Sequence, residues 1–263
     1  MPLEKIIVTN ITYPERSRKY GHLVCVGGIT EDTQEWRRLY PIVADLFFNN
    51  QYSRFHKWDI IEVKVEKLPN NKDPRKESYR VINWREIKQV GHIKDWNERR
   101  KIVDKQVVQG MNVLVQKQYE DWTSMGVIKP KLIKGFLEKD RHRVTNEGDL
   151  RVLEVMETLT YYMETCPKLK FQPDTINKWI GYDFLCYEDK CNGHTMMVND
   201  WECQELYRRK GFEKTKEKYY DWMLNNRDLY FMMGTVARKH TWIIVGVFYP
   251  PKIKDESLDK YIG

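Results

Sequence analysis

The chain has 263 residues, of which 41% are hydrophobic and 13% aromatic, and its formal net charge is +7 with a pI near 9.0. So many aromatic residues exclude a disordered chain, and the length allows one large domain or two modest ones. The longest apolar run, WIIVGVFY at 242–249, is far below the roughly 20 residues of a membrane helix. Because no secretory signal is recognisable either, we expect a soluble cytoplasmic protein that makes no membrane contact.

The first eighty residues have the pattern of β-structure. Candidate strands are EKIIVTN, HLVCVGGI, EWRRLYPI and WDIIEVKVEKL. In the last of these, Ile61, Val63 and Val65 alternate with polar residues, which indicates a strand with one buried face. Several short strands at this spacing predict a small barrel or sandwich.

Residues 84–120 show mixed three- and four-residue apolar spacing, which predicts a helical connector. Strand-like segments then return as MGVIKPKLIKGF, YDFLC, HTMMV, DLYFMMGTV and TWIIVGVFY, with a helix expected after a cap at Asn199. We therefore predict an α+β chain divided into a β-rich part at 1–83, a helical connector at 84–120 and an α+β part at 121–263.

A cluster of possible metal ligands lies in CYEDKCNGHTMMVNDWEC, residues 186–203. The chain has 5 cysteines, an odd number, and three of them are in this stretch, which favours a metal site in a reducing compartment over a disulfide framework. Zinc prefers four thiolate or imidazole ligands, so we predict a structural zinc that clips a β-turn-α unit through Cys186, Cys191, His194 and Cys203. In the alternative reading Cys203 is simply a buried core residue.

The same stretch permits a second interpretation, as the centre of an enzyme. His194, Asp200 and Glu202 could bind Mg²⁺ or Mn²⁺ and activate a water molecule for hydrolysis. Two acidic residues at the start of a helix are, however, also what capping and the helix dipole favour. The structural role is the better interpretation of this acidic pair.

Basic residues accumulate next to aromatic ones in several segments. Residues 71–105 carry eleven Lys or Arg against six Asp or Glu, and residues 129–143 carry six against two. Single-stranded nucleic acid is bound in this way, because bases stack on rings while Lys and Arg contact phosphates. A solvated surface with salt bridges is the simpler interpretation for any single residue. The candidate contact residues are Arg37, Arg38, Trp84, Trp96, Arg141 and Arg143.

The runs HLVCVGGITEDTQEWRRLYPI and WDIIEVKV, followed by a Pro-containing turn, resemble a family of uncharacterised archaeal and bacterial proteins. The resemblance covers mainly residues 4–83, with a weaker match in MGVIKPKLIKGF. It implies a pair of domains like the oligonucleotide/oligosaccharide-binding (OB) barrel, and an association with nucleic-acid modification or defence. It implies no catalytic residues. OB barrels bind nucleic acid on one face and its flanking loops, which is an argument by analogy.

Three functions remain open from the sequence. The first is a nucleic-acid-binding protein that grips single-stranded or distorted DNA or RNA, with one structural zinc. The second is a metal-dependent nuclease or nucleotide-processing enzyme that uses His194, Asp200 and Glu202. The third is a protein–protein interaction module. No Gly-rich phosphate loop, nucleophile elbow or dinucleotide fingerprint is present in the sequence.

Overall fold

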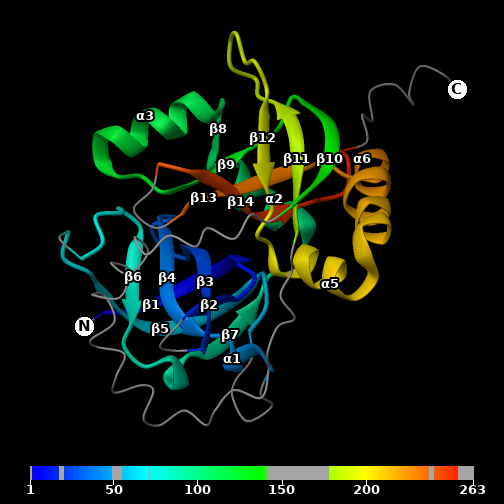
Figure 1. Ribbon diagram of the computed structural model, residues 1–263. Helices are drawn as coiled ribbons and strands as arrows, with labels where there is room; N and C mark the ends of the chain where they lie inside the picture. Colours follow the sequence, from blue (N-terminus) through cyan, green and yellow to red (C-terminus); the bar gives the residue numbers. More distant parts are fainter. Residues whose placement is uncertain are drawn as a thin grey trace, which may run out of the picture.

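The computed structural model describes residues 2–17, 21–48, 55–70, 72–140, 178–236 and 240–253. Figure 1 shows two β-rich parts, one above the other, which confirms the predicted α+β class. Among the described residues, no helix combines the length and the apolar character needed to cross a membrane.

The first part is a closed barrel of five strands. They are β1 (Leu3–Ile11), β3 (Gly21–Thr30), β4 (Trp36–Val43), β6 (Ser78–Val81) and β5 (Asp59–Lys67), neighbours in that order. Pairing of β5 with β1 closes the ring, and the β4–β6 pair is parallel while the others are antiparallel. This cyclic order of a five-stranded Greek-key barrel is that of an OB barrel. β2 (Glu15–Ser17) pairs with β3, β7 (Lys88–His92) pairs with β5, and α1 (Asp45–Phe48) follows β4.

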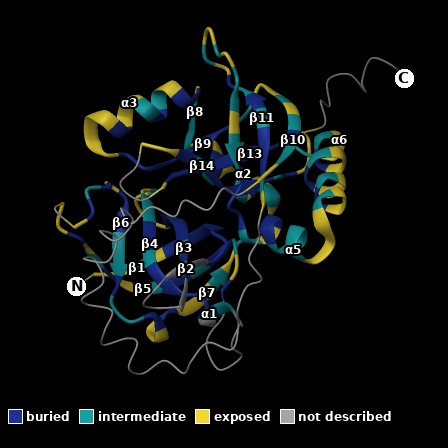
Figure 2. Ribbon diagram, in the orientation of Figure 1, coloured by how far each residue is buried: buried dark blue, intermediate teal, exposed yellow. Residues whose placement is uncertain are grey.

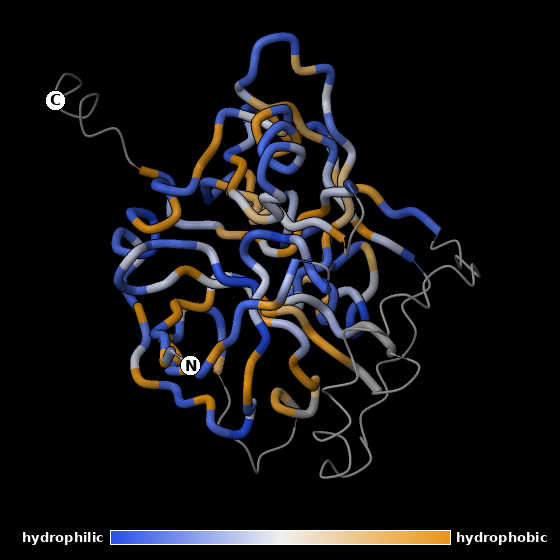
Figure 3. The backbone as a smooth tube through the Cα atoms, turned by 90° about the vertical axis from the view of Figure 1, so that its left-hand side faces the viewer, coloured by the Kyte–Doolittle hydropathy of each residue, from blue (hydrophilic) through white to orange (hydrophobic). Residues whose placement is uncertain are grey.

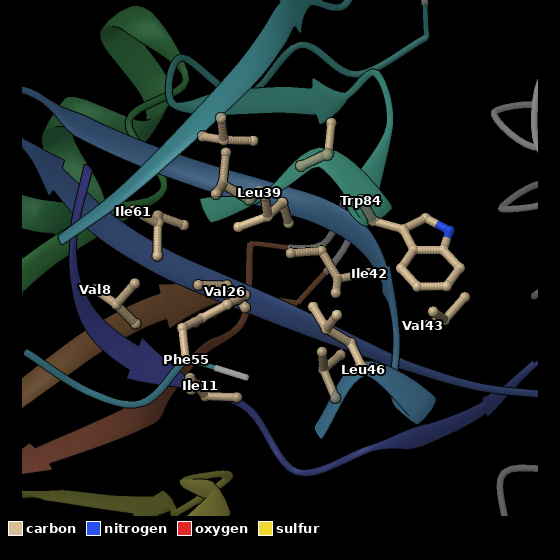
Figure 4. Packing of buried hydrophobic residues seen from close by; sticks show 14 of the residues in the cluster. Val8, Ile11, Val26, Leu39, Ile42, Val43, Leu46, Phe55, Ile61 and Trp84 are labelled. Carbon is tan, nitrogen blue, oxygen red and sulfur yellow. The ribbon is translucent and has the colours of Figure 1, made fainter. Parts of the chain in front are cut away.

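Alternating side chains fill the inside of this barrel. Ile61, Val63 and Val65 of β5 are buried, as their alternation predicts, and they pack with Val8, Val26 and Leu39 of the neighbouring strands (Figure 4). Trp84, which begins the short 3-10 helix η1 (Trp84–Glu86), belongs to the same core. A strand buried on one face gains stability from each inward residue, which explains why the period-two pattern located these strands correctly.

The second part repeats this strand order. β9 (Met125–Ile128) and β10 (Leu132–Asp140) are consecutive in sequence and occupy the place of the first strand. β10 pairs with β11 (Lys178–Leu185), and β11 with β12 (His194–Met197). β12 is joined to β14 (Trp242–Phe248) by a parallel bridge between Val198 and Ile244, β14 pairs with β13 (Tyr230–Thr235), and β13 returns to β9. Two OB-like parts are therefore present, as expected.

Helices connect the strands of the second part and the two parts themselves. The predicted connector at 84–120 is helical only in part: η1 and the strand β7 of the first sheet come first, followed by α2 (Trp96–Asp104), the short strand β8 (Val107–Val108) and α3 (Met111–Asp121). After β12, α5 (Trp201–Lys216) continues through the π-helical segment η3 (Glu217–Trp222) into α6 (Met223–Asn226). The cap of α5 is Asp200 rather than the predicted Asn199, because the Asp200 side chain accepts the Cys203 amide.

A third hydrophobic cluster joins the two parts. Ile7 on β1 and Trp58 before β5 pack with residues of the second part: Val127, Tyr230, Met232, Val245 and Phe248. The Trp58 and Phe248 ring centroids are 4.9 Å apart. Because buried apolar side chains of both parts pack together in this cluster, the two barrels form one packed unit.

Candidate metal centre and nucleic-acid surface

The loop between β11 and β12 brings four possible metal ligands together. They are Cys186, Glu188, Cys191 and His194, whose ligand atoms all lie within 4.8 Å of one another. The loop projects at the top of Figure 1 and is mostly hydrophilic in Figure 3. Two residues with positive φ reverse the chain in this loop. Gly193 has a φ of 99°, which glycine adopts readily, and Lys190 has a φ of 61°.

Two separations within this cluster, whose donor atoms lie within 4.8 Å of one another, match those of a tetrahedral metal site. Zn–S bonds of about 2.3 Å and Zn–N or Zn–O bonds of about 2.0 Å place tetrahedral ligands about 3.3–3.8 Å apart. The Cys191 Sγ atom lies 3.4 Å from His194 Nε2, and a Glu188 Oε1 atom lies 3.5 Å from the same nitrogen. Two thiols, an imidazole and a carboxylate form a donor set that zinc accepts and that Mg²⁺ does not prefer.

The Cys186 thiol depends on a cation to become a ligand. Burial raises its pKa to about 12, and this outweighs the hydrogen bond from the Met111 amide at the start of α3. A coordinated metal ion deprotonates such a thiol outright. The protonated thiol is therefore the form expected without metal, and the thiolate is the form expected with it.

Cys203 does not belong to this cluster, which corrects the predicted ligand set. It is fully buried in the first turn of α5, in the core of the second barrel, where burial raises the pKa of its thiol well above the usual value. This is the position that the alternative interpretation of Cys203, as a core residue, expects. The fourth member of the cluster is Glu188. Its place between the two cysteines in the sequence is the feature that could have identified it as a possible ligand.

The three residues of the hydrolytic alternative are divided between two places. His194 lies in the metal cluster, whereas Asp200 and Glu202 accept hydrogen bonds from Lys57 Nζ at 2.5 Å and 3.1 Å. Among the described residues no metal-type group contains Asp200 or Glu202. The structure therefore does not bring these residues together as a hydrolytic centre.

Lys57 joins the first barrel to the start of α5 as a buried ion pair. Its side chain is 8% exposed and that of Asp200 is 0% exposed. Burial lowers the pKa of Lys57, but the charges of Asp200 and Glu202 outweigh it and raise this pKa above the usual value. Lys57 in turn lowers the pKa of Glu202. The acidic pair thus has a structural role, at a helix cap and between the barrels.

The outer face of β3 and β4, which corresponds to the ligand face of OB barrels, is covered at one end in the first barrel. A Cβ atom on Gly27 would lie 2.5 Å from Met125 Cε of the second part. Arg38, its partner on β4, is 4% exposed and donates to the Ser124 carbonyl oxygen at 2.7 Å. The second barrel itself thus occupies this end of the face.

The corresponding face of the second barrel, on β10, β11 and β12, remains partly exposed (Figure 2). Cross-strand pairing places Lys139 beside Trp179, and Leu137 and Met197 on either side of Gly181. These side chains point away from the core residues Phe136, Tyr182 and Phe184. Asp183 pairs with Thr195 on the same side of the sheet. We name the surface formed by Leu137, Lys139, Trp179, Asp183, Thr195 and Met197 the open face.

The predicted nucleic-acid contacts lie in different environments. Arg38 and Trp84 are buried, and Arg37 is 11% exposed, with ion pairs to Glu4 and Glu35. None of these three side chains has a large solvent-exposed surface that a ligand could contact. Arg141 and Arg143 lie outside the described residues, and they directly follow β10 in sequence.

Trp96 is partly exposed in a cluster of rings and guanidinium groups. Its ring stacks on Phe248 with centroids 5.9 Å apart, and Arg99 lies 4.8 Å from its centroid. Arg227 lies 5.8 Å from the Trp96 centroid and 5.1 Å from that of Trp222, which is 42% exposed. The Arg227 Nε atom is buried and has no hydrogen-bond partner among the described residues. Stacked guanidinium groups of this kind can bind phosphate.

Comparison with known families and structures agrees with a division into two parts. A family model described as "Domain of unknown function (DUF8757)" matches residues 106–262, more than half of the chain, and the chain therefore belongs to that family. A second one, "Domain of unknown function (DUF8758)", matches residues 2–105. The boundary between the two falls between α2 and β8. No curated protein matches the chain.

Two solved structures show distant likeness. One is the crystal structure of the p204 HINb domain, with 9% identity, a TM-score of 0.32 and coverage of 95% of this chain and 97% of that chain. The other is a replication protein A heterotrimer bound to ssDNA, with 10% identity, a TM-score of 0.36 and coverage of 98% of this chain and 50% of that chain. These scores do not establish a common fold, so the OB assignment rests on the strand order described above.

Proposed function

We propose that this member of the DUF8757 family is a nucleic-acid-binding protein that holds single-stranded or distorted DNA or RNA on the open face of its second barrel. The observation that supports this proposal is the partly exposed β10–β11–β12 surface of an OB-ordered barrel, with Trp179 beside Lys139. The position corresponds to the strands on which OB barrels bind oligonucleotides. The net charge of +7 favours a polyanionic partner as well.

The residues of the open face suit stacking better than base-edge readout. Trp179 offers an indole, and Leu137 and Met197 offer apolar contacts around Gly181. Stacking on rings tolerates any base sequence, because every base has a π-face. Lys139 would contact phosphate, and Arg141 and Arg143, which continue the chain from β10, would add to that charge. The bound strand would therefore be held with little sequence preference and with strong salt dependence.

The cluster around Trp96 provides a second contact area in this proposal. Arg227 has no carboxylate partner among the described residues, whereas the neighbouring Arg100 is paired with Asp228 at 2.8 Å. An unpaired guanidinium group beside two indoles suits a phosphate group or a stacked base. Replacement of Arg227 by Gln should weaken binding without loss of an ion pair.

The proposal includes one structural zinc in the loop between β11 and β12. Its ligands would be Cys186, Cys191 and His194, with Glu188 in the same cluster. A zinc ion would fix the loop at one end of the open face, because β11 ends and β12 begins at this loop. Metal content of the protein as purified, measured by elemental analysis with and without Cys191→Ser, tests this part separately from nucleic-acid binding.

The binding experiment is a fluorescence anisotropy titration with labelled single-stranded DNA and RNA of one sequence, repeated over a range of salt concentrations. Replacing Trp179 by Ala should cost about 1–3 kcal/mol, the contribution of one stacked base. Tyr119→Ala is the matched control, because Tyr119 is an aromatic residue with 67% exposure on α3, away from the open face. A salt slope near zero, or equal affinities of the wild type and the Trp179→Ala and Lys139→Glu variants, would refute the proposal.

A further inference from the structure

The two oxygen atoms of Glu188 face two different groups. Oε1 lies 3.5 Å from His194 Nε2, within the metal cluster. Oε2 accepts the backbone amide of Asn112, at 3.0 Å, in the first turn of α3. The Glu188 side chain is only 8% exposed, although its neighbours Tyr187 and Asp189 are exposed. The carboxylate thus lies between the metal loop and the first turn of α3, whose Asn112 is 76 residues earlier in the sequence.

The start of α3 depends on the metal loop for its hydrogen bonds. Gly110, the N-cap residue, makes no side-chain cap. A Cβ atom at Gly110 would lie 2.3 Å from Glu188 Oε2, so the glycine leaves space for the carboxylate. Cys186 also receives a hydrogen bond from the Met111 amide. Two of the first-turn amides, which have no partner within a helix, are therefore satisfied by residues of the metal cluster.

From this geometry we propose that Glu188 is the fourth ligand of the zinc ion, through Oε1, while Oε2 keeps the Asn112 amide. Metal binding then stabilises the contact between the first turn of α3 and the loop between β11 and β12. The inference rests on the zinc ion proposed above and adds its fourth ligand and its effect on α3. The ligand set becomes two thiolates, one imidazole and one carboxylate, which is a closed four-coordinate site.

The charges of the site support this arrangement. Two thiolates and a carboxylate carry three negative charges, and a zinc ion leaves one of them uncompensated. The positive end of the α3 dipole, with the Met111 and Asn112 amides, faces that remaining charge. Hydrogen bonds to a ligating carboxylate also orient it toward the metal. The helix therefore stabilises the ligands, and the ligands stabilise the helix.

The other end of α3 is attached to the first barrel. The Lys76 amide donates to the Trp122 carbonyl oxygen at 3.1 Å, and Lys76 Nζ pairs with Asp121 at 2.6 Å. Lys76 lies in the connection between β5 and β6. In this arrangement α3 spans from the metal loop of the second barrel to a loop of the first.

The first test measures zinc affinity by competition with a chromophoric chelator. Glu188→Ala should bind zinc more weakly by at least the roughly 10–100-fold that loss of an orienting partner alone costs, because a direct ligand is removed. Asp189→Ala is the matched control, because Asp189 is the adjacent exposed acidic residue outside the cluster. The zinc affinity of this variant should equal that of the wild type. The visible spectrum of the Co²⁺-substituted protein should also change in Glu188→Ala and not in Asp189→Ala.

The second test follows backbone amide exchange in the wild-type protein with zinc and after chelation. Protection of the Met111 and Asn112 amides should fall on metal removal by more than that of the barrel strand β5, which serves as an internal reference. Equal zinc affinity and equal Co²⁺ spectra for Glu188→Ala and the wild type would overturn the assignment of the fourth ligand. Absence of zinc binding by the wild type would overturn the zinc proposal itself, and neither result depends on nucleic acid.

Discussion

Replacement of Lys57 by Met should destabilise the protein strongly, although Lys57 lies in a loop. Its Nζ atom is 2.5 Å from Asp200 Oδ2, and both side chains are buried. The same carboxylate accepts the Cys203 amide at 3.1 Å and the Val247 amide at 3.2 Å, so it cannot move to solvent without breaking the α5 cap. Lys57→Met would leave a buried, uncompensated carboxylate.

The expected cost follows from that uncompensated charge. Removing one partner of a buried ion pair lowers the free energy of unfolding by about 3–5 kcal/mol. Asp200→Asn in the Lys57→Met background should recover part of this loss, because Asn is neutral and remains a good helix cap. The coupling between the two substitutions should exceed about 1 kcal/mol.

Urea or guanidinium unfolding, followed by Trp fluorescence and by circular dichroism, measures these free energies. Lys64→Met provides the control, since Lys64 pairs with Glu86 at 3.1 Å with both side chains more than half exposed. Its cost should stay below about 1 kcal/mol. The reasoning is wrong if Lys57→Met costs no more than Lys64→Met, or if adding Asp200→Asn increases the loss instead of reducing it.

Further predictions concern pH, interface packing and the barrel core. Lys57 lowers the pKa of Glu202 in the folded protein. The Glu202 carboxylate therefore contributes its full stability above the usual pKa of Glu, and this contribution is lost as the pH falls through the pKa of Glu202 in the folded protein. Glu202→Gln should therefore lose stability, by less than about 1 kcal/mol, near neutral pH but not in acid, as urea midpoints at the two pH values would show. Gly27→Ala should cost about 1–3 kcal/mol by thermal unfolding, because its Cβ atom would lie 2.3 Å from Oδ1 of the buried Asn10 and 2.5 Å from Met125 Cε; a cost near zero would mean that both side chains move aside freely. Trp84→Ala should lower the free energy of unfolding by about 3–5 kcal/mol and leave oligonucleotide affinity of the folded protein unchanged, since Trp84 lies in the barrel core; a selective loss of affinity would contradict that placement.

The fold was predictable to the extent that it depends on local patterns. Ile61, Val63 and Val65 alternate because one face of β5 is buried, and this signal needs no knowledge of distant residues. The loop with Cys186, Cys191 and His194 was equally visible, because these possible ligands lie within nine residues and a turn between them brings them together. Local sequence order sufficed for strands, turns and the proximity of these three residues.

Other features depend on residues far apart in the chain. Cys203 and Glu188 were both within reach of the metal loop by spacing alone, and only the direction of each side chain decided between them: Cys203 points into the core of the second barrel, and Glu188 points to His194 and α3. Asp200 meets Lys57, a residue 143 positions away, so its role as a buried partner could not be inferred from its own helix.

The same distinction applies to the proposed binding surface. Arg38 and Trp84 combine the right residue types with basic and aromatic neighbours, but a sequence pattern does not say which face of a barrel another barrel will cover. Packing of Met125 and Ser124 against β3 and β4 buries Arg38, whereas the strands from Leu132 to Met197 keep one face partly exposed. The sequence by itself determined the strands, their inward residues and the metal loop, because these depend on side-chain alternation and turn chemistry over a few residues. Only the tertiary structure decided the fourth member of the metal cluster, the partner of Asp200 and the face left exposed, because each depends on how the two barrels dock.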